Sequence, residues 1–182
     1  MAQSGSGRDE ECVVATVKKW TVIAAFLALN ACTEERLGRA RLTVGDPAPD
    51  YSAQSFAGDS VDLAGLRVRP LVVNLWATWC APCRAEMPEL QELAEYYGES
   101  LEVIGISIDG RGSEDLIQGF LEDVGVDFRI LLDPDQRVVR EFTTIGVPET
   151  FLIDTEGIIR ARWIGRFFPF DSANLALIED IL

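Results

Sequence analysis

Short apolar runs along the chain alternate with amphipathic stretches, a pattern that predicts buried strands separated by helices. Leu71–Trp76 and Leu101–Ile108 have the length and composition expected of buried central strands. Between them, apolar residues recur at spacings of three and four from Ala81 to Tyr97, which predicts a helix. A strand, a helix and a second strand in this order indicate an α/β fold.

The remaining pattern extends this order on both sides. Tyr51–Leu63 alternates around Gly58-Asp59, which predicts a β-hairpin before the first central strand. A helix is expected from Ser113, as its N-cap, to about Val124. The other expected elements are a strand at Phe128–Leu132, a short helix at Val138–Phe142, strands at Glu149–Asp154 and Ile158–Trp163, and a helix from about Ser172 to Ile181. The sequence therefore predicts a mixed central sheet between layers of helices.

The first 32 residues have a different character and predict a leader. Lys18-Lys19 precede the apolar run Trp20–Leu29, and Asn30-Ala31-Cys32 follow it, as in a secretory signal. The run is shorter than the roughly 20 residues of a membrane-spanning helix. Because residues 29–32 also resemble a bacterial lipobox, Cys32 is expected to be acylated; an ordinary cleaved signal or a short anchor are the alternatives. We expect a tether at residues 33–43 and a folded domain at 44–182, held outside the cytoplasm.

Composition excludes several classes of function. The chain carries 16 basic and 30 acidic residues, a net charge of −14, which argues against a nucleic-acid partner. The sequence contains no histidine, so a Ser-His or Cys-His nucleophile, His-ligated zinc and His-held haem are all excluded. We expect membrane contact only through the leader or its lipid.

The four cysteines point to redox chemistry. Cys12 and Cys32 fall in the leader, so the domain keeps only Cys80 and Cys83. A structural zinc site needs four ligands, and two thiolates without histidine do not complete one. We therefore expect no metal and no cofactor, and interpret the Cys80–Cys83 pair as a redox-active disulfide.

The setting of this pair predicts how it reacts. Cys80 follows a predicted strand and begins a predicted helix, where free backbone amides and the helix dipole favour a thiolate. Pro82 falls in the first helical turn, where its missing N–H costs little. We expect Cys80 to be the exposed attacking thiol and Cys83 to resolve the mixed disulfide.

Two motifs resemble a known family. Asn74–Pro88, which contains Trp79-Cys80-Ala81-Pro82-Cys83, is similar to the active-site segment of the thioredoxin superfamily, nearest to its extracytoplasmic TlpA/ResA/DsbE (CcmG) branch. Gly146–Asp154 is similar to the second signature of that branch. The resemblance covers about residues 44–182 and implies a thioredoxin-like three-layer α/β/α fold with an N-terminal hairpin extension. It also implies that Pro148 is a cis-proline facing the disulfide, with Val147 beside it, in a loop that pairs with the substrate chain.

The same resemblance suggests further site residues. Glu86 matches a branch glutamate that takes part in proton handling, so we expect it to accept or return the proton of Cys83; a solvent-facing helix carboxylate is the alternative. The position of Asn74 carries a buried aspartate in cytoplasmic thioredoxins, which this chain lacks. We expect Trp79 to contribute to the docking surface and Trp76 to pack in the core.

The leading hypothesis is an extracytoplasmic thiol–disulfide oxidoreductase that reduces exported proteins. The resemblance implies apocytochrome c as a substrate, in cytochrome c maturation, and a membrane thiol–disulfide carrier as electron donor. The alternatives are a peroxiredoxin-like antioxidant, for which Val73 and Ala77 stand where Pro and Thr are required, a copper-binding chaperone of the same fold, and a non-catalytic redox sensor. The direction of electron flow stays open, because one Cys-x-x-Cys skeleton serves potentials from about −120 to −270 mV.

Overall fold

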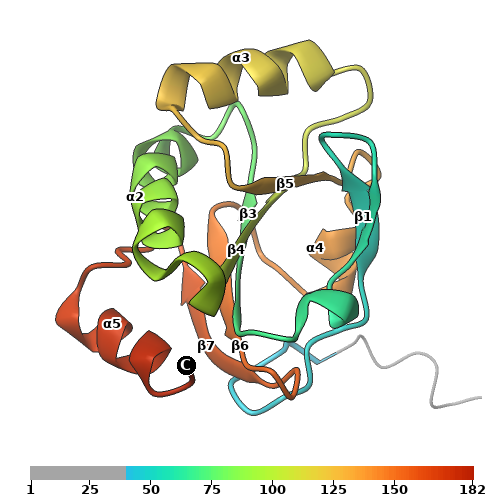
Figure 1. Cartoon of the computed structure of the whole chain (residues 1–182). Coiled ribbons are helices and arrows are strands. Elements are labelled where there is room, and N and C mark those ends of the chain that lie inside the picture. Colours follow the sequence, from blue (N-terminus) through green and yellow to red (C-terminus); the bar gives the residue numbers. More distant parts are fainter. Residues whose placement is uncertain (1–39) are drawn as a thin grey trace, which may run out of the picture. The chain divides into compact units, whose positions relative to one another are not determined.

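Seven strands form one mixed sheet in the computed structural model, which describes residues 40–182 (Figure 1). The strands are β1 (Ser52–Ser55), β2 (Ser60–Asp62), β3 (Leu71–Trp76), β4 (Glu102–Ser107), β5 (Arg129–Leu132), β6 (Glu149–Ile153) and β7 (Ile159–Ile164). Their order across the sheet is β2-β1-β5-β4-β3-β6-β7. The three central strands β5, β4 and β3 run parallel, whereas the strands on both flanks pair antiparallel. The predicted mixed sheet and its N-terminal hairpin are thus confirmed.

Four α-helices connect and cover these strands in the described part of the chain. They are α2 (Ala81–Tyr97), α3 (Glu114–Val124), α4 (Arg137–Glu141) and α5 (Ser172–Glu179), and two short 3₁₀ turns, η2 (Ala64–Leu66) and η3 (Gly98–Ser100), complete the elements. Every residue of β3, β4 and β6 is buried. Strands buried on both faces read as continuous apolar runs, which is why the sequence pattern located β3 and β4 closely.

The helices lie on both faces of the sheet. Trp76 at the end of β3 stacks on Phe120 of α3, with ring centroids 4.8 Å apart. Phe151 of β6 pairs in register with Val73 and contacts Phe142, the residue after α4, at 5.1 Å. Because successive strand residues point to opposite faces, Trp76 and Val73 mark two different helix layers. The thioredoxin-like three-layer arrangement is therefore confirmed.

Two local expectations need correction. Ser113 precedes α3 as predicted, but its side chain makes no capping hydrogen bond. Its backbone, at φ −96° and ψ 8°, departs from the extended conformation in which a cap side chain reaches the helix amides. The last helix ends at Glu179 instead of Ile181.

The signal segment 1–32 with its acylation site Cys32, and most of the expected tether at 33–43, lie outside the described residues and stay predictions. Among residues 40–182, no helix combines the length and the apolar character that a membrane span requires.

Candidate active site

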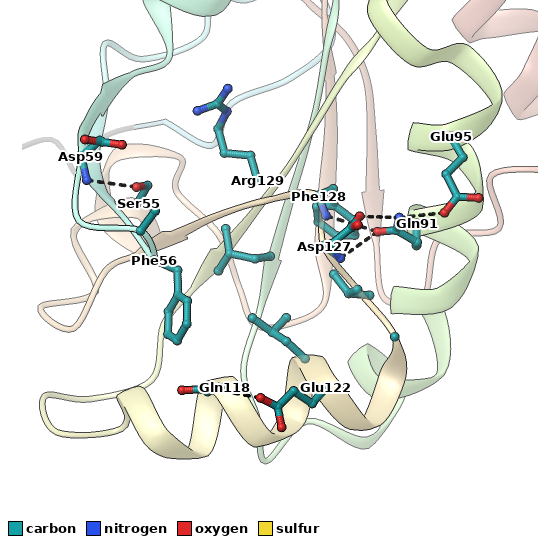
Figure 2. Close-up of a pocket in the computed structure, with 15 residues that line it drawn as sticks. Ser55, Phe56, Asp59, Gln91, Glu95, Gln118, Glu122, Asp127, Phe128 and Arg129 are labelled. Atoms are coloured by element: carbon teal, nitrogen blue, oxygen red, sulfur yellow. Dashed lines mark hydrogen bonds between the residues drawn. The ribbon is translucent and has the colours of Figure 1, made fainter.

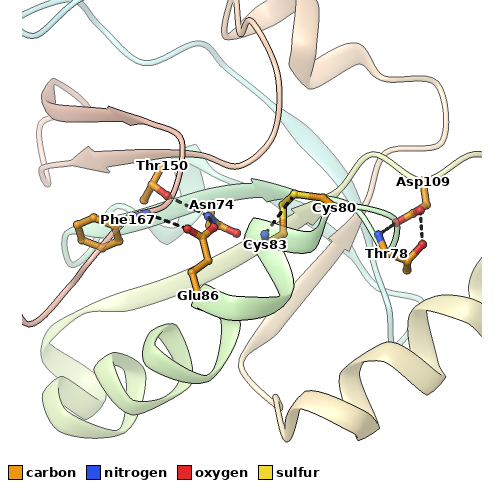
Figure 3. Close-up of a disulfide and its surroundings, with 8 residues drawn as sticks. All are labelled: Asn74, Thr78, Cys80, Cys83, Glu86, Asp109, Thr150 and Phe167. Carbon is orange, nitrogen blue, oxygen red and sulfur yellow. Dashed lines mark hydrogen bonds between the residues drawn. A yellow bond between two sulfur atoms is a disulfide. The ribbon is translucent and has the colours of Figure 1, made fainter.

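The two domain cysteines form a disulfide at the start of α2 (Figure 3). Their Cα atoms are 5.3 Å apart, and Cys80 is the N-cap residue of the helix. The backbone N–H of Cys83 donates to the Sγ atom of Cys80 at 3.2 Å. β3 ends at Trp76, so only the loop Ala77–Trp79 separates the central strand from the disulfide. The predicted strand-to-helix placement of the pair is confirmed.

Exposure around the pair differs in part from expectation. Cys83 is fully buried and Cys80 is 5% exposed, so their order is as predicted, but Cys80 is not an exposed residue. The physical reason is that its sulfur is turned toward, and bonded to, the buried Cys83 in this oxidised form. The neighbouring Trp79 is 69% exposed and Pro82 is also exposed. These two side chains therefore contribute to the surface beside the disulfide.

The segment Val147-Pro148, which lies far along the sequence from the cysteines, reaches the end of β3 that leads to the disulfide. The peptide bond between Val147 and Pro148 is cis, as the resemblance implies. The register pairs Glu149 with Leu75, which brings Pro148 to the end of β3 that leads to Cys80. Pro148 is buried, and its carbonyl accepts a hydrogen bond from the N–H of Gly165 at 2.9 Å. The contribution of Val147 and Pro148 to substrate binding stays a prediction.

Glu86 is a buried carboxylate one helical turn beyond Cys83. It is 0% exposed, which rules out the solvent-facing alternative. One of its oxygens accepts from Asn74 Nδ2 at 2.7 Å and the other from the N–H of Phe167 at 2.8 Å (Figure 3). Burial raises the pKa of Glu86 from 4.5 to about 7, although these two hydrogen bonds and the charge of Arg166 act in the opposite direction. A carboxyl with this pKa exchanges its proton readily near neutral pH.

The loop before Cys80 has an anchor that sequence reasoning missed. Thr78 is hydrogen-bonded through its backbone N–H and its hydroxyl to Asp109, a buried residue just beyond β4. A signal for it was available, because the carboxyl ends of adjacent parallel strands share one edge of a sheet. The contact of the Phe167 backbone with Glu86 was also missed, and no local pattern indicates it.

The aromatic residues divide between core and surface. Trp76 is fully buried, as expected. Phe167 is fully buried against Trp163, with ring centroids 4.2 Å apart, whereas Phe168 and Phe170 are 45% and 38% exposed. Packing against each other thus explains Trp163 and Phe167.

A cavity in the described region lies away from the disulfide. It measures about 810 Å³ and is bounded by the β1–β2 hairpin, α3 and the start of β5 (Figure 2). Its apolar floor includes Leu121, Phe128 and Ile130, and polar residues at its rim pair with one another, as Gln118 does with Glu122. Within residues 40–182 no group of three or more cysteine and carboxylate side chains is arranged to hold a metal ion.

Comparison with known proteins agrees with this site. A family model described as the AhpC/TSA family matches residues 44–162. The thioredoxin-like protein YneN of Bacillus subtilis is 30% identical over 122 residues, which cover 66% of this chain and 71% of that protein. The thiol:disulfide interchange protein DsbE of Vibrio cholerae is 32% identical over 147 residues, or 79% of this chain and 77% of its own.

Solved structures extend the likeness to three dimensions. The crystal structure of a putative thiol:disulfide interchange protein DsbE from Chlorobium tepidum superposes with a TM-score of 0.70 at 27% identity, covering 77% of this chain and 98% of that one. A DsbF homologue from Corynebacterium diphtheriae gives a TM-score of 0.64, also at 27% identity, with 80% and 95% covered.

Proposed function

The chain belongs to the AhpC/TSA family and is a thiol–disulfide oxidoreductase of the ResA/DsbE type, and from this premise we propose that it acts outside the cytoplasm as a reductase of exported protein disulfides. Apocytochrome c is the proposed substrate, in cytochrome c maturation, and a membrane thiol–disulfide carrier is the proposed electron donor. The signal-like residues 17–32 support the location, because a basic start and a short apolar run are typical of exported proteins.

The observation that carries the proposal is the placement of Cys80 at the N-cap of α2. Its sulfur already accepts the Cys83 N–H in the oxidised form. In the reduced form the same amide and the positive end of the helix dipole stabilise a Cys80 thiolate. A free cysteine with a pKa of about 8.5 would be largely protonated at neutral pH, so this stabilisation makes Cys80 the nucleophile.

The reaction follows with atoms and electrons balanced. The Cys80 thiolate attacks one sulfur of the substrate disulfide, forms a mixed disulfide and releases the other substrate sulfur as a thiolate. Cys83 then loses its proton and attacks the Cys80 sulfur. This step re-forms the Cys80–Cys83 disulfide and frees the second substrate sulfur, so two electrons have passed to the substrate.

Glu86 is proposed as the acceptor of the Cys83 proton. It lies on the same helix one turn further on, and its raised pKa of about 7 lets it gain and lose a proton at neutral pH. Trp79 and Pro82, which are exposed beside the disulfide, are proposed to contact the substrate together with Val147 and Pro148.

A redox titration of the Cys80/Cys83 pair against glutathione or dithiothreitol tests the direction of electron flow. A potential of about −270 mV, as in thioredoxin, supports a reductase, and one of about −120 mV would instead indicate an oxidase. Reduction of an oxidised apocytochrome peptide, compared with a scrambled peptide of the same composition, tests the substrate. Equal rates with both peptides would contradict the assignment to cytochrome c maturation.

A further inference from the structure

Asp109 ties the loop in front of the nucleophile to the end of β4. One carboxylate oxygen accepts from the Thr78 hydroxyl at 2.7 Å, and the other accepts from the Thr78 backbone N–H at 3.0 Å (Figure 3). The second oxygen also accepts from the hydroxyl of Ser107 at 2.8 Å. Thr78 stands two residues before Cys80, so Asp109 holds the loop that carries the attacking sulfur.

The sheet register brings these residues together. β3 and β4 are parallel, with Trp76 opposite Ser107, and the Ile108 N–H continues the pairing to the Trp76 carbonyl at 3.0 Å. Thr78 and Asp109 each come two residues after the paired residues Trp76 and Ser107. The backbone N–H of Asp109 donates to Ser107 Oγ at 3.1 Å, so the carboxylate is itself anchored to β4.

Burial makes this anchor strong. Asp109 is 6% exposed, and its carboxylate is satisfied by two hydroxyls and a backbone amide instead of water. Hydrogen bonds to an ionised acceptor are roughly twice as strong as neutral ones. Two of the three end on Thr78, which is only partly buried and lies in the turn that the Cys80 N–H closes by donating to the Ala77 carbonyl at 3.1 Å.

We propose that Asp109 is a positioning residue for thiol–disulfide exchange. Acting through Thr78, it fixes the loop Ala77–Trp79 so that the Cys80 sulfur meets a substrate disulfide in line with the bond that breaks. The inference rests on the exchange activity of the Cys80–Cys83 pair. If the loop were displaced, the Cys80 thiolate would still form, but it would be misaligned with the substrate disulfide. Alignment affects the reaction with a protein disulfide far more than the reaction with a small reagent.

The experiment compares the wild-type protein with Asp109→Ala, Asp109→Asn, Thr78→Val and the double variant Asp109→Ala/Thr78→Val. Reduction of insulin disulfides with dithiothreitol as reductant gives kcat and KM. Alkylation of reduced Cys80 by iodoacetamide at about pH 10, where the thiol is ionised, measures the reactivity of the Cys80 sulfur toward a small reagent. Asp133→Asn is the matched control, because Asp133 is 2% exposed, follows the adjacent strand β5, and accepts from the N–H of Val138.

We expect Asp109→Ala to lower kcat about tenfold or more, with KM and the alkylation rate unchanged. Thr78→Val keeps the backbone hydrogen bond and should lose less, and the double variant should be no slower than Asp109→Ala, since both changes break one connection. Asp133→Asn should keep the wild-type kcat. Asp109→Asn retains one acceptor and should fall between the wild type and Asp109→Ala.

Three results would overturn the inference: wild-type kcat in Asp109→Ala and Thr78→Val, multiplicative losses in the double variant, or an equal loss in Asp133→Asn. If Asp109→Ala does not fold, the double variant Asp109→Asn/Thr78→Val is compared with Asp109→Asn in the same way. A wild-type protein that fails to reduce insulin would contradict the exchange activity itself, which separates that failure from a failure of the positioning role.

Discussion

Replacing Glu86 with glutamine should remove a pH-dependent contribution to stability. Glutamine keeps the shape of the side chain and one oxygen to accept the Phe167 N–H. Its amide group then faces Asn74, whose Oδ1 atom has no hydrogen-bond partner and whose Nδ2 donates to both Glu86 and Thr150. A flip of the Asn74 amide would let its oxygen accept from glutamine and from the Thr150 hydroxyl, so the variant is expected to fold with the local contacts satisfied.

The size of this pH-dependent contribution to the free energy of unfolding follows from the pKa of Glu86. Burial raises that pKa from 4.5 to about 7, and the folded protein therefore binds this proton more tightly than the unfolded chain does. The stabilisation is complete below about pH 4.5, is lost as the pH rises to about 7, and stays lost above it. A difference of about 2.5 in pKa, at about 1.4 kcal/mol for each unit, corresponds to about 3 kcal/mol.

Urea unfolding of the oxidised proteins from pH 4 to pH 8 measures this effect. The unfolding free energy of the wild type minus that of Glu86→Gln should fall by about 3 kcal/mol between pH 4.5 and 7 and then level off. Glu92→Gln, which removes an exposed carboxylate of the same helix, controls for the loss of a negative charge. A free-energy difference between wild type and Glu86→Gln that does not change with pH would refute the reasoning.

Three further predictions follow from the site and the core. Cys80→Ser should abolish disulfide exchange, whereas Cys83→Ser should accumulate mixed disulfides visible on non-reducing gels; normal turnover by Cys83→Ser would reverse the assigned roles. Gly105→Ala should destabilise the fold by about 1–3 kcal/mol in urea unfolding, because the added methyl would lie 2.8 Å from Ile130 Cδ1. Gly119→Ala, which has open space in α3, should instead stabilise by up to about 1 kcal/mol, and equal effects of the two substitutions would contradict the packing argument.

The contacts of Glu86 link the active-site helix to the C-terminal part of the chain. Glu86 is held between Asn74 of the central strand and the backbone of Phe167, a residue packed against Trp163 of β7. The nucleophile loop is held from the opposite side by Asp109 (Figure 3). The disulfide thus lies between two buried carboxylates with different contacts, one proposed to transfer protons and one proposed to hold the loop.

The sequence by itself determined the order of strands and helices and the redox pair. Leu71–Trp76 and Ala81–Tyr97 were located because apolar runs and helical spacing are properties of contiguous residues. Cys80 and Cys83 needed only their own spacing and the strand-to-helix junction. The cis bond before Pro148 was anticipated only through the resemblance, since spacing alone does not distinguish the isomers.

Tertiary structure alone decided how the side chains around the disulfide are buried and paired. Glu86 meets the backbone of a residue 81 positions away, and Thr78 meets a carboxylate 31 positions away, so no local pattern encodes either contact. The pKa of Glu86 follows from the water that this packing excludes, and a helix carboxylate looks the same in sequence whether it is buried or exposed. Ser113 is a residue type suited to capping, yet its side chain makes no capping hydrogen bond. The loop holds its backbone outside the extended conformation that capping requires.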